Sequence, residues 1–171
     1  MNNLEKAFGA TNDSLLLLTQ RWQQRSFKIM SLTPQRIFLM KFASTRLIAG
    51  DINTLVSFYE MVTATKAQWL SPQFAEIITP SATLAIGSAE TVALFSAGSA
   101  EPASNRTAIL KFIVDDVDAD FERLQGKVDL VHEPKLMPWG NRCLQFRDPE
   151  GTIVGLFTPF TDFAKARFGS R

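Results

Sequence analysis

The sequence predicts an α+β fold built from two pseudo-symmetric βαβββ modules, and an internal repeat is the main reason. The segment STRLIAGDINTLVSFYEMV (44–62) aligns with ILKFIVDDVDADFERLQGK (109–127). Each copy contains a short alternating stretch, then an aspartate, Asp51 or Asp116, and then apolar residues at helical spacing. Three strand-like stretches follow in each copy. The same order of elements therefore occurs twice.

The first element of each copy is a strand, and the second is a one-sided helix. Asp51 and Asp116 stand immediately before the apolar pattern, where an aspartate side chain can accept hydrogen bonds from the first turn of a helix. The inward face of both helices is predicted from matched positions: Ile52, Val56 and Tyr59 correspond to Val117, Phe121 and Leu124.

Three strands are expected after each helix, separated by turn residues. In the first copy we place them at about 66–70, 74–79 and 91–96, with TPSATLAIGSAE as an irregular link. In the second copy we place them at about 128–132, 142–147 and 152–157. The closing strands match as TVALFSA and TIVGLFTP.

These elements define one domain over residues 42–160, with module 1 at about 42–97 and module 2 at about 107–160. The segment AGSAEPASNR (97–106) is small, polar and proline-containing, as expected of a connector. Residues 161–171 are predicted to form a C-terminal tail.

Residues 1–40 differ in charge from the rest of the chain, with five basic and two acidic side chains. Such a bias is seen in organelle transit peptides. Alternatively, the segment is a loosely attached extension with a helix at about 15–29, or the working chain starts at Met30 or Met40. We leave it out of the functional argument.

Composition excludes several classes of function. The 171 residues carry a formal net charge of +1, which does not favour binding to nucleic acid or to an anionic membrane. No apolar run approaches the roughly 18 residues that span a bilayer. Cys143 is the single cysteine, so an intrachain disulfide is excluded and a reducing compartment, the cytoplasm, is expected.

Three motifs in this order resemble the vicinal oxygen chelate superfamily: DINTLVSFY, VDDVDADFERL and PWGNRCLQFRDPEG. That superfamily includes glyoxalase I, bleomycin-resistance proteins, fosfomycin-resistance proteins and extradiol dioxygenases. The resemblance covers residues 42–160. It implies curved mixed sheets around a cleft, completed by modules of one or two chains, and we expect a homodimer.

The resemblance also implies where metal ligands would stand, namely on the first and last strand of each module. Counting back from the two aspartates and along the closing strands, these positions become Ser44, Ala93, Ile109 and Gly155. None supplies the imidazole, carboxylate or thiolate that divalent ions prefer. We therefore expect no metal and no other cofactor.

Strand alternation predicts which side chains face the cleft. Residues in step with the lost ligand positions include Arg46 on the first strand and Lys111 on the fifth. Two cations without a matching acid favour an anionic ligand, because buried charges need partners. The alternative is that either side chain pairs with a carboxylate such as Glu76 or reaches water.

Other side chains could complete a ligand site. Trp139 resembles a tryptophan that precedes the seventh strand in bleomycin-resistance-like proteins, where it contacts a flat ligand, but it could equally anchor a loop. Gln145 offers one donor and one acceptor if it points inward. Trp69 and Phe95 could line the half of the cleft that module 1 contributes.

The remaining polar candidates have ordinary structural explanations. The run Asp148-Pro149-Glu150-Gly151 fits a hairpin corner better than a catalytic carboxylate pair. Cys143 fits a buried strand thiol. His132, the single histidine, is placed on or just past the sixth strand, at the surface or the rim of the cleft.

Three functions remain open, and the first is favoured. The chain is a metal-independent binding protein for a small anionic or aromatic molecule, without enzyme activity. Alternatively, it is a lyase or isomerase that uses Arg46 or Lys111 as the electrophilic group and an unidentified base such as His132 or Glu76. A third reading is a degenerate dimerising module whose cleft is filled by side chains such as Ile109 and Ile113.

Overall fold

The computed structural model describes residues 41–168, and residues 42–168 belong to one compact unit. The helix predicted at about 15–29 lies outside the described residues. The elements run β1 (Ser44–Ala49), α2 (Ile52–Thr63), β2 (Gln68–Ser71), β3 (Phe74–Ile78), β4 (Thr83–Ser88), η1 (Ala89–Leu94), β5 (Ile109–Ile113), α3 (Val117–Leu124), β6 (Asp129–Leu136), β7 (Asn141–Arg147), β8 (Ile153–Pro159) and α4 (Asp162–Phe168).

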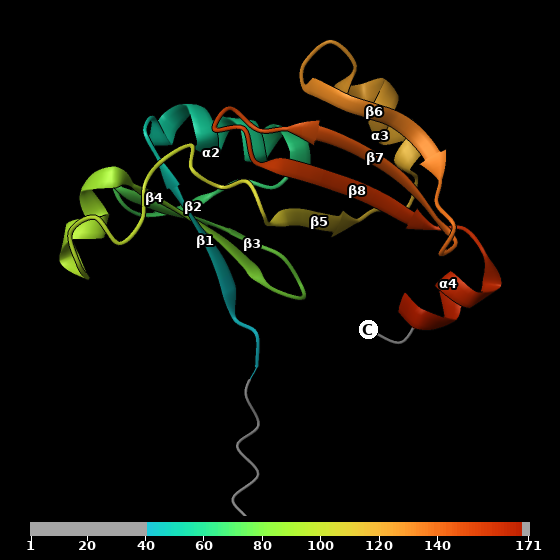
Figure 1. The fold of residues 1–171 in the computed structure, drawn as a ribbon, viewed down its shortest axis with the longest axis horizontal. Coiled ribbons are helices and arrows are strands. Elements are labelled where there is room, and N and C mark those ends of the chain that lie inside the picture. Colours follow the sequence, from blue (N-terminus) through green and yellow to red (C-terminus); the bar gives the residue numbers. More distant parts are fainter. Residues whose placement is uncertain (1–40, 169–171) are drawn as a thin grey trace, which may run out of the picture. The chain divides into compact units, whose positions relative to one another are not determined.

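The strands form two four-stranded mixed sheets with the same connectivity (Figure 1). Their orders are β1-β4-β3-β2 and β5-β8-β7-β6. In each sheet the first strand pairs in parallel with the last, β1 with β4 and β5 with β8, and the other neighbours are antiparallel. The predicted α+β fold of two repeated βαβββ modules is confirmed.

Both predicted helix starts are also confirmed. The Asp51 carboxylate accepts hydrogen bonds from the backbone N–H groups of the second and third residues after it, at 3.0 and 3.2 Å. Asp116 makes the same two bonds at the same distances. Each aspartate therefore satisfies two N–H groups that the first turn of its helix leaves without a partner.

The apolar face of each helix packs on its sheet as the spacing predicts. Ile52, Val56 and Tyr59 of α2 are buried, as are Val117 and Leu124 of α3. Side chains of both modules belong to one continuous core cluster. Burial of this shared apolar surface is the main stabilising term for the unit.

The closing strand of module 1 differs from the prediction. Residues Thr83–Ser88, taken for part of an irregular link, form β4, whereas the predicted strand at 91–96 falls largely in the 3₁₀ helix η1. The segment TLAIGS lies between β1 and β3 and is covered on both faces, so small residues suit it. Thr91 is held in η1 by donating its hydroxyl proton to Ser88 O at 2.6 Å.

Strand β6 also differs, because it continues to Leu136 rather than ending at His132. It is an edge strand, where a proline such as Pro134 is tolerated. The pairing with β7 is irregular on both sides of His132. His132 therefore lies inside the strand.

A buried hydrogen bond joins the two modules. The Tyr59 hydroxyl on α2 donates to Asp148 Oδ2 at the β7–β8 corner over 2.8 Å. Beside it, the rings of Phe58 and Phe146 meet edge to face with centroids 6.1 Å apart. Burial, together with the neighbouring Asp148 charge, raises the pKa of Tyr59 well above its ordinary value, so this phenol remains a donor.

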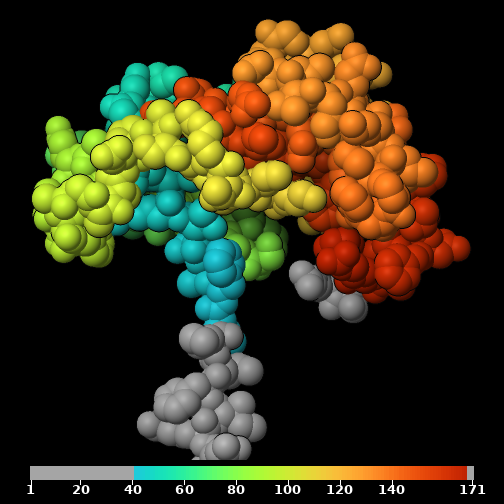
Figure 2. All heavy atoms as spheres, in the orientation of Figure 1, coloured from blue at the N-terminus to red at the C-terminus, as the bar shows by residue number. Residues whose placement is uncertain are grey.

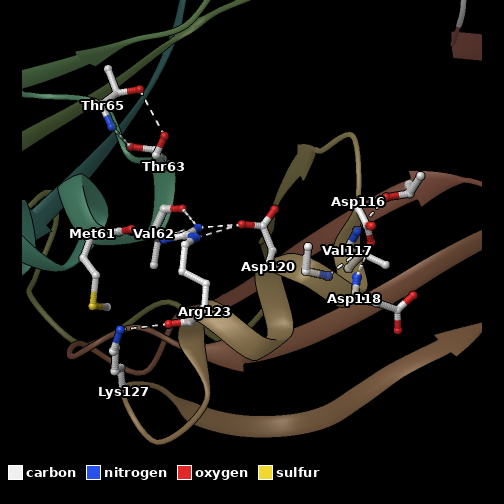
Figure 3. A network of polar contacts seen from close by, with 12 residues as sticks. Met61, Val62, Thr63, Thr65, Asp116, Val117, Asp118, Asp120, Arg123 and Lys127 are labelled. Carbon is white, nitrogen blue, oxygen red and sulfur yellow. Dashed lines mark hydrogen bonds and ion pairs between the residues drawn. The ribbon is translucent and has the colours of Figure 1, made fainter.

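A second junction lies at the end of α2 (Figure 3). Arg123 of α3 donates to the carbonyl oxygens of Met61 and Val62 at 2.6 and 2.8 Å. It also forms an ion pair with Asp120 at 2.7 Å. The guanidinium thus supplies donors to carbonyls that the end of the helix leaves unpaired.

The connector between the modules runs over the surface, shown in yellow in Figure 2. Most of its residues are exposed. Near it, Gly50 N donates to Glu150 Oε1 at 2.8 Å, which adds a third contact between the modules. No helix among residues 41–168 is both long enough and apolar enough to cross a membrane.

We predict that Tyr59→Phe destabilises the domain by about 1–3 kcal/mol, because it removes the donor from a buried carboxylate. Urea unfolding followed by tryptophan fluorescence measures this change. Ser104→Ala is the control, since it removes an exposed hydroxyl bonded to Pro102 O and is expected to cost less than about 0.5 kcal/mol. Equal effects of the two changes would mean that the Tyr59 contact is unimportant for stability.

Candidate functional site

The corner at residues 148–151 is structural, as predicted. Gly151 has a φ of 80° and donates to Asp148 O at 2.9 Å, which closes the turn. The Asp148 carboxylate accepts from Tyr59, Glu150 N and Thr152 N. Burial raises the pKa of Asp148, and these three hydrogen bonds oppose the rise. The carboxylate is therefore used by the fold.

Each sheet has one face against the helices and one face turned away from them. On β5, Leu110 and Phe112 pack on the core, whereas Ile109, Lys111 and Ile113 are exposed on the opposite face. We call the face away from the helices the Lys111 face in module 2. The corresponding face of module 1, which carries Arg46, is the Arg46 face.

The Lys111 face brings three of the predicted site residues together. The register pairs Lys111 with Gly155 and Gly155 with Gln145, so these residues form a row across the sheet. A Cβ atom placed on Gly155 would lie 3.6 Å from Lys111 Cγ and 3.7 Å from Gln145 Cγ. Both side chains therefore lean over the bare backbone of the glycine.

Aromatic rings flank the ammonium group of this row. Lys111 Nζ lies 5.8 Å from the ring centroid of Trp139 and 5.9 Å from that of Phe157, within the range of a cation–π contact. Trp139 is 48% exposed and directly precedes the turn at Gly140. Among residues 41–168, no carboxylate forms an ion pair with Lys111.

The Arg46 face has the same plan but a more enclosed cation. The Arg46 guanidinium lies 5.3 Å from the ring of Phe74 and 4.9 Å from that of Phe95, and its Nη2 donates to Thr91 Oγ1. No acid in the described part of the chain pairs with it, Glu76 included. Its Nε atom is buried without a partner there.

Close approach of Arg46 to the sheet depends on Gly87. A Cβ atom at that position would come within 2.8 Å of Thr91 Oγ1 and 2.9 Å of Arg46 Nη2. The contact between Arg46 and Thr91 thus holds η1 against the sheet. In this chain Arg46 and Phe95 lie together, while Lys111, Gln145 and Trp139 form a separate group.

Trp69 lies apart from both groups. The register sets it opposite Ala75, which is fully buried in the core. Directly opposed residues on antiparallel strands share a face, so Trp69 lies on the helix side of the sheet, away from Arg46. The register shift between Trp69 and Ser71 on the same strand makes such alternation hard to foresee.

The positions implied for metal ligands need one correction. Ser44, Ile109 and Gly155 lie on β1, β5 and β8, but Ala93 lies in η1 and not on a strand. Because Arg46 pairs with Ala85 as Lys111 pairs with Gly155, the counterpart of Gly155 is Ala85. A hydroxymethyl group, two alkyl groups and a hydrogen do not fit a divalent ion.

The described residues offer no other metal site, and their cysteine is not an activated nucleophile. Within 41–168, no three His, Cys, Asp or Glu side chains lie together as a group that could hold a metal ion. Cys143 is buried on β7, opposite Phe157, and burial raises the pKa of its thiol while the Lys111 charge opposes this. A thiol in this state is a poor nucleophile.

Two cavities lie within residues 41–168, and the second has Arg46 in its lining. One of about 460 Å³ is an open hollow beside the start of α3, lined by Asp116 and Arg123 among others. Another, of about 260 Å³, lies between β1, the connector and the corner at Asp148. The predicted ligand residues lie mostly on open sheet faces, which a partner could close over.

His132 is the residue that the sequence placed least well. The register sets it opposite Gln145, so it extends the row of Lys111, Gly155 and Gln145 to the edge strand. Its Nε2 atom is buried and has no hydrogen-bond partner in the part of the chain described. The sequence signal was weak, because irregular pairing around His132 breaks the alternation of β6.

Comparison with known proteins agrees with the fold. The family model of the glyoxalase-like domain matches residues 42–160. A glyoxalase/bleomycin resistance protein/dioxygenase from Nocardioides is 23% identical, with a TM-score of 0.61, and the match covers 84% of this chain and 95% of that one. No curated protein matches the chain.

Two further solved structures show the same fold. A glyoxalase/bleomycin resistance protein/dioxygenase family enzyme from Burkholderia phytofirmans is 19% identical, with a TM-score of 0.63, over 71% of this chain and 100% of that one. A lactoylglutathione lyase from Agrobacterium tumefaciens is 20% identical, with a TM-score of 0.57, over 71% and 95%.

The two glycines of the sheet faces are expected to respond differently to alanine. Gly87→Ala should destabilise the domain by about 1–3 kcal/mol, because the added methyl group displaces Arg46 and Thr91. Gly155→Ala meets only ordinary contacts and should change stability by less than about 1 kcal/mol, or stabilise slightly. Urea unfolding of both variants compares them, and an equal loss would show that Gly87 makes no special contact.

Proposed function

Because this chain belongs to the glyoxalase-like domain family, of the vicinal oxygen chelate superfamily, we propose that it binds a small anionic or aromatic molecule without a metal. The environment of Lys111 is the main support for this proposal. Its ammonium group is exposed, lies between two aromatic rings, and has no paired acid among residues 41–168. An oxyanion supplies the missing countercharge, and a flat ligand supplies contact with Trp139.

The ligand residues that we propose come from both modules. Lys111, Trp139 and Gln145 form the part of the site that the chain presents openly. Arg46 and Phe95 would contribute from the Arg46 face, where the guanidinium is already stacked and held by Thr91. Trp69 lies on the helix side of its sheet, so it would reach a ligand only if its side chain moved to the opposite face. We therefore give it the smallest role.

The residues at the four ligand positions support binding without a metal. A reaction of the metal-dependent type needs several strong donors around one ion, and those positions carry Ser44, Ala85, Ile109 and Gly155. We therefore propose a binding or sequestering role, with no resident cofactor.

We also propose that the chain forms a homodimer. Ile109 and Ile113 are 45% and 54% exposed on the Lys111 face, and Ile78 is 53% exposed on the strand next to β4. Apolar side chains gathered on a sheet face favour cover by another surface. Light scattering should give twice the 19.1 kDa of the chain, and Ile113→Asp should reduce this mass. A monomer at micromolar concentration would contradict the proposal.

We propose a small molecule as the ligand, rather than nucleic acid or a membrane, because the net charge of +1 gives no general attraction to polyanions. We propose the cytoplasm as the location, because the sequence has a single, unpaired cysteine.

A thermal-shift experiment with benzoate and inorganic phosphate tests the anion site. A ligand that binds only the folded protein raises its melting temperature, and at a hundred times its Kd the stabilisation is about 2.7 kcal/mol. We expect a shift for at least one of the two anions, and we expect Lys111→Ala to abolish it. Trp139→Ala should weaken binding of benzoate more than that of phosphate.

Lys66→Ala is the matched control, because Lys66 is an exposed lysine paired with Glu60 away from this face. It should leave the shift unchanged. A shift that survives in Lys111→Ala, or one that Lys66→Ala removes equally, would contradict the proposed site.

A further inference from the structure

The row across the Lys111 face has a polar group at each end. Lys111 stands on β5 and His132 on β6, with Gly155 and Gln145 between them in register. The corresponding row of module 1 is Arg46, Ala85, Glu76 and Gln68. The two rows therefore share a cation at one end and a small residue next to it. Only the module 2 row ends in an imidazole.

The hydrogen bond at His132 Nδ1 determines whether Nε2 is a donor or an acceptor. Nδ1 lies 2.8 Å from Glu133 O, and a backbone carbonyl oxygen can only accept a hydrogen bond. Nδ1 must therefore carry the proton. In the neutral ring, Nε2 then has a free lone pair and acts as an acceptor.

This acceptor has no donor in residues 41–168, although it is buried. Buried polar atoms in folded proteins are nearly always paired, because an unpaired one costs about 1–3 kcal/mol. Ser88 Oγ and Asn141 Oδ1 are also unpaired, but neither belongs to the row with Lys111. His132 is thus the unpaired group that shares a row with the exposed cation.

The spacing of the strands limits the size of a ligand that reaches both ends. Neighbouring strands lie about 4.8 Å apart, so the backbones at Lys111 and His132, three strand spacings apart, are separated by roughly 14 Å. The Lys111 side chain, which leans over Gly155, shortens this gap. One aromatic ring with substituents at opposite ends fits the interval, and Gln145 lies beneath its middle.

We propose that the Lys111 face recognises a planar carboxylate with a hydrogen-bond donor, a hydroxyl or N–H group, at its far end. Lys111 takes the carboxylate, Trp139 contacts the ring, and His132 Nε2 accepts from the donor group. His132 is then the residue that determines specificity. This inference rests on the proposed function, since it requires a ligand at Lys111.

Calorimetric titration of the full chain with three acids tests the inference: benzoate, 4-hydroxybenzoate and 4-methoxybenzoate. In the unmodified protein at pH 8, 4-hydroxybenzoate should bind about 5- to 10-fold more tightly than the other two, as expected for one net hydrogen bond. His132→Phe should remove this preference.

Gln68→Ala is the matched control, because Gln68 holds the equivalent place in the module 1 row. It should keep the preference for the hydroxyl compound. Lys111→Ala should weaken all three acids together. The preference for the hydroxyl compound is measured in the unmodified protein. The test therefore remains valid even if a variant folds poorly.

Two results would overturn the inference and leave the proposed function standing. One is equal affinity for the three acids in the unmodified protein. The other is a preference for the hydroxyl compound that persists in His132→Phe. Absence of binding by all three acids would also overturn the inference, and a thermal shift with phosphate that depends on Lys111 would then show whether the anion site itself remains.

Discussion

The buried hydrogen bond between Tyr59 and Asp148 is the constraint on which the rest of the structure depends. It joins the helix of module 1 to the β7–β8 corner of module 2 inside a common core. Both groups are buried, so loss of this bond would leave the Tyr59 hydroxyl and Asp148 Oδ2 without the partner that each has here. The corner in turn fixes the register of β7 and β8, and with it the positions of Gln145 and Gly155. The site on the outer face thus depends on a contact made in the interior.

Joining the modules through their helices has a consequence for function. Helix α2, helix α3 and the core cluster occupy one face of each sheet, and the faces that carry Arg46 and Lys111 are left for other partners. The two cations therefore form separate groups within the chain. A second copy or a ligand can cover these faces, which agrees with the exposed isoleucines found there.

The sequence was sufficient for the repeat, the helix starts and the face of β5 that carries Lys111, because each depends on a local pattern. Asp51 and Asp116 act through their own helix turns, and the alternation of β5 is regular. Strand β4 was missed because TLAIGS contains few of the large β-branched residues that mark a strand, and its burial comes from neighbours distant in sequence. The sequence therefore placed the ligand position of module 1 at Ala93, whereas the structure places it at Ala85.

The side of Trp69 and the place of His132 could not be predicted for a different physical reason. Both lie on edge strands whose pairing shifts register, and one extra residue moves the following side chains to the other face. A sequence pattern contains no record of such a shift. That His132 Nε2 is buried and unpaired among the described residues can be seen only in the folded structure.

We propose that this glyoxalase-like domain binds its ligand through cations and aromatic rings, without a metal. The most direct measurement is metal analysis of the purified protein combined with calorimetric titration of benzoate before and after treatment with a chelator. We expect no stoichiometric metal and an unchanged affinity. Stoichiometric zinc, nickel, manganese or iron, with binding lost on chelation, would contradict the claim.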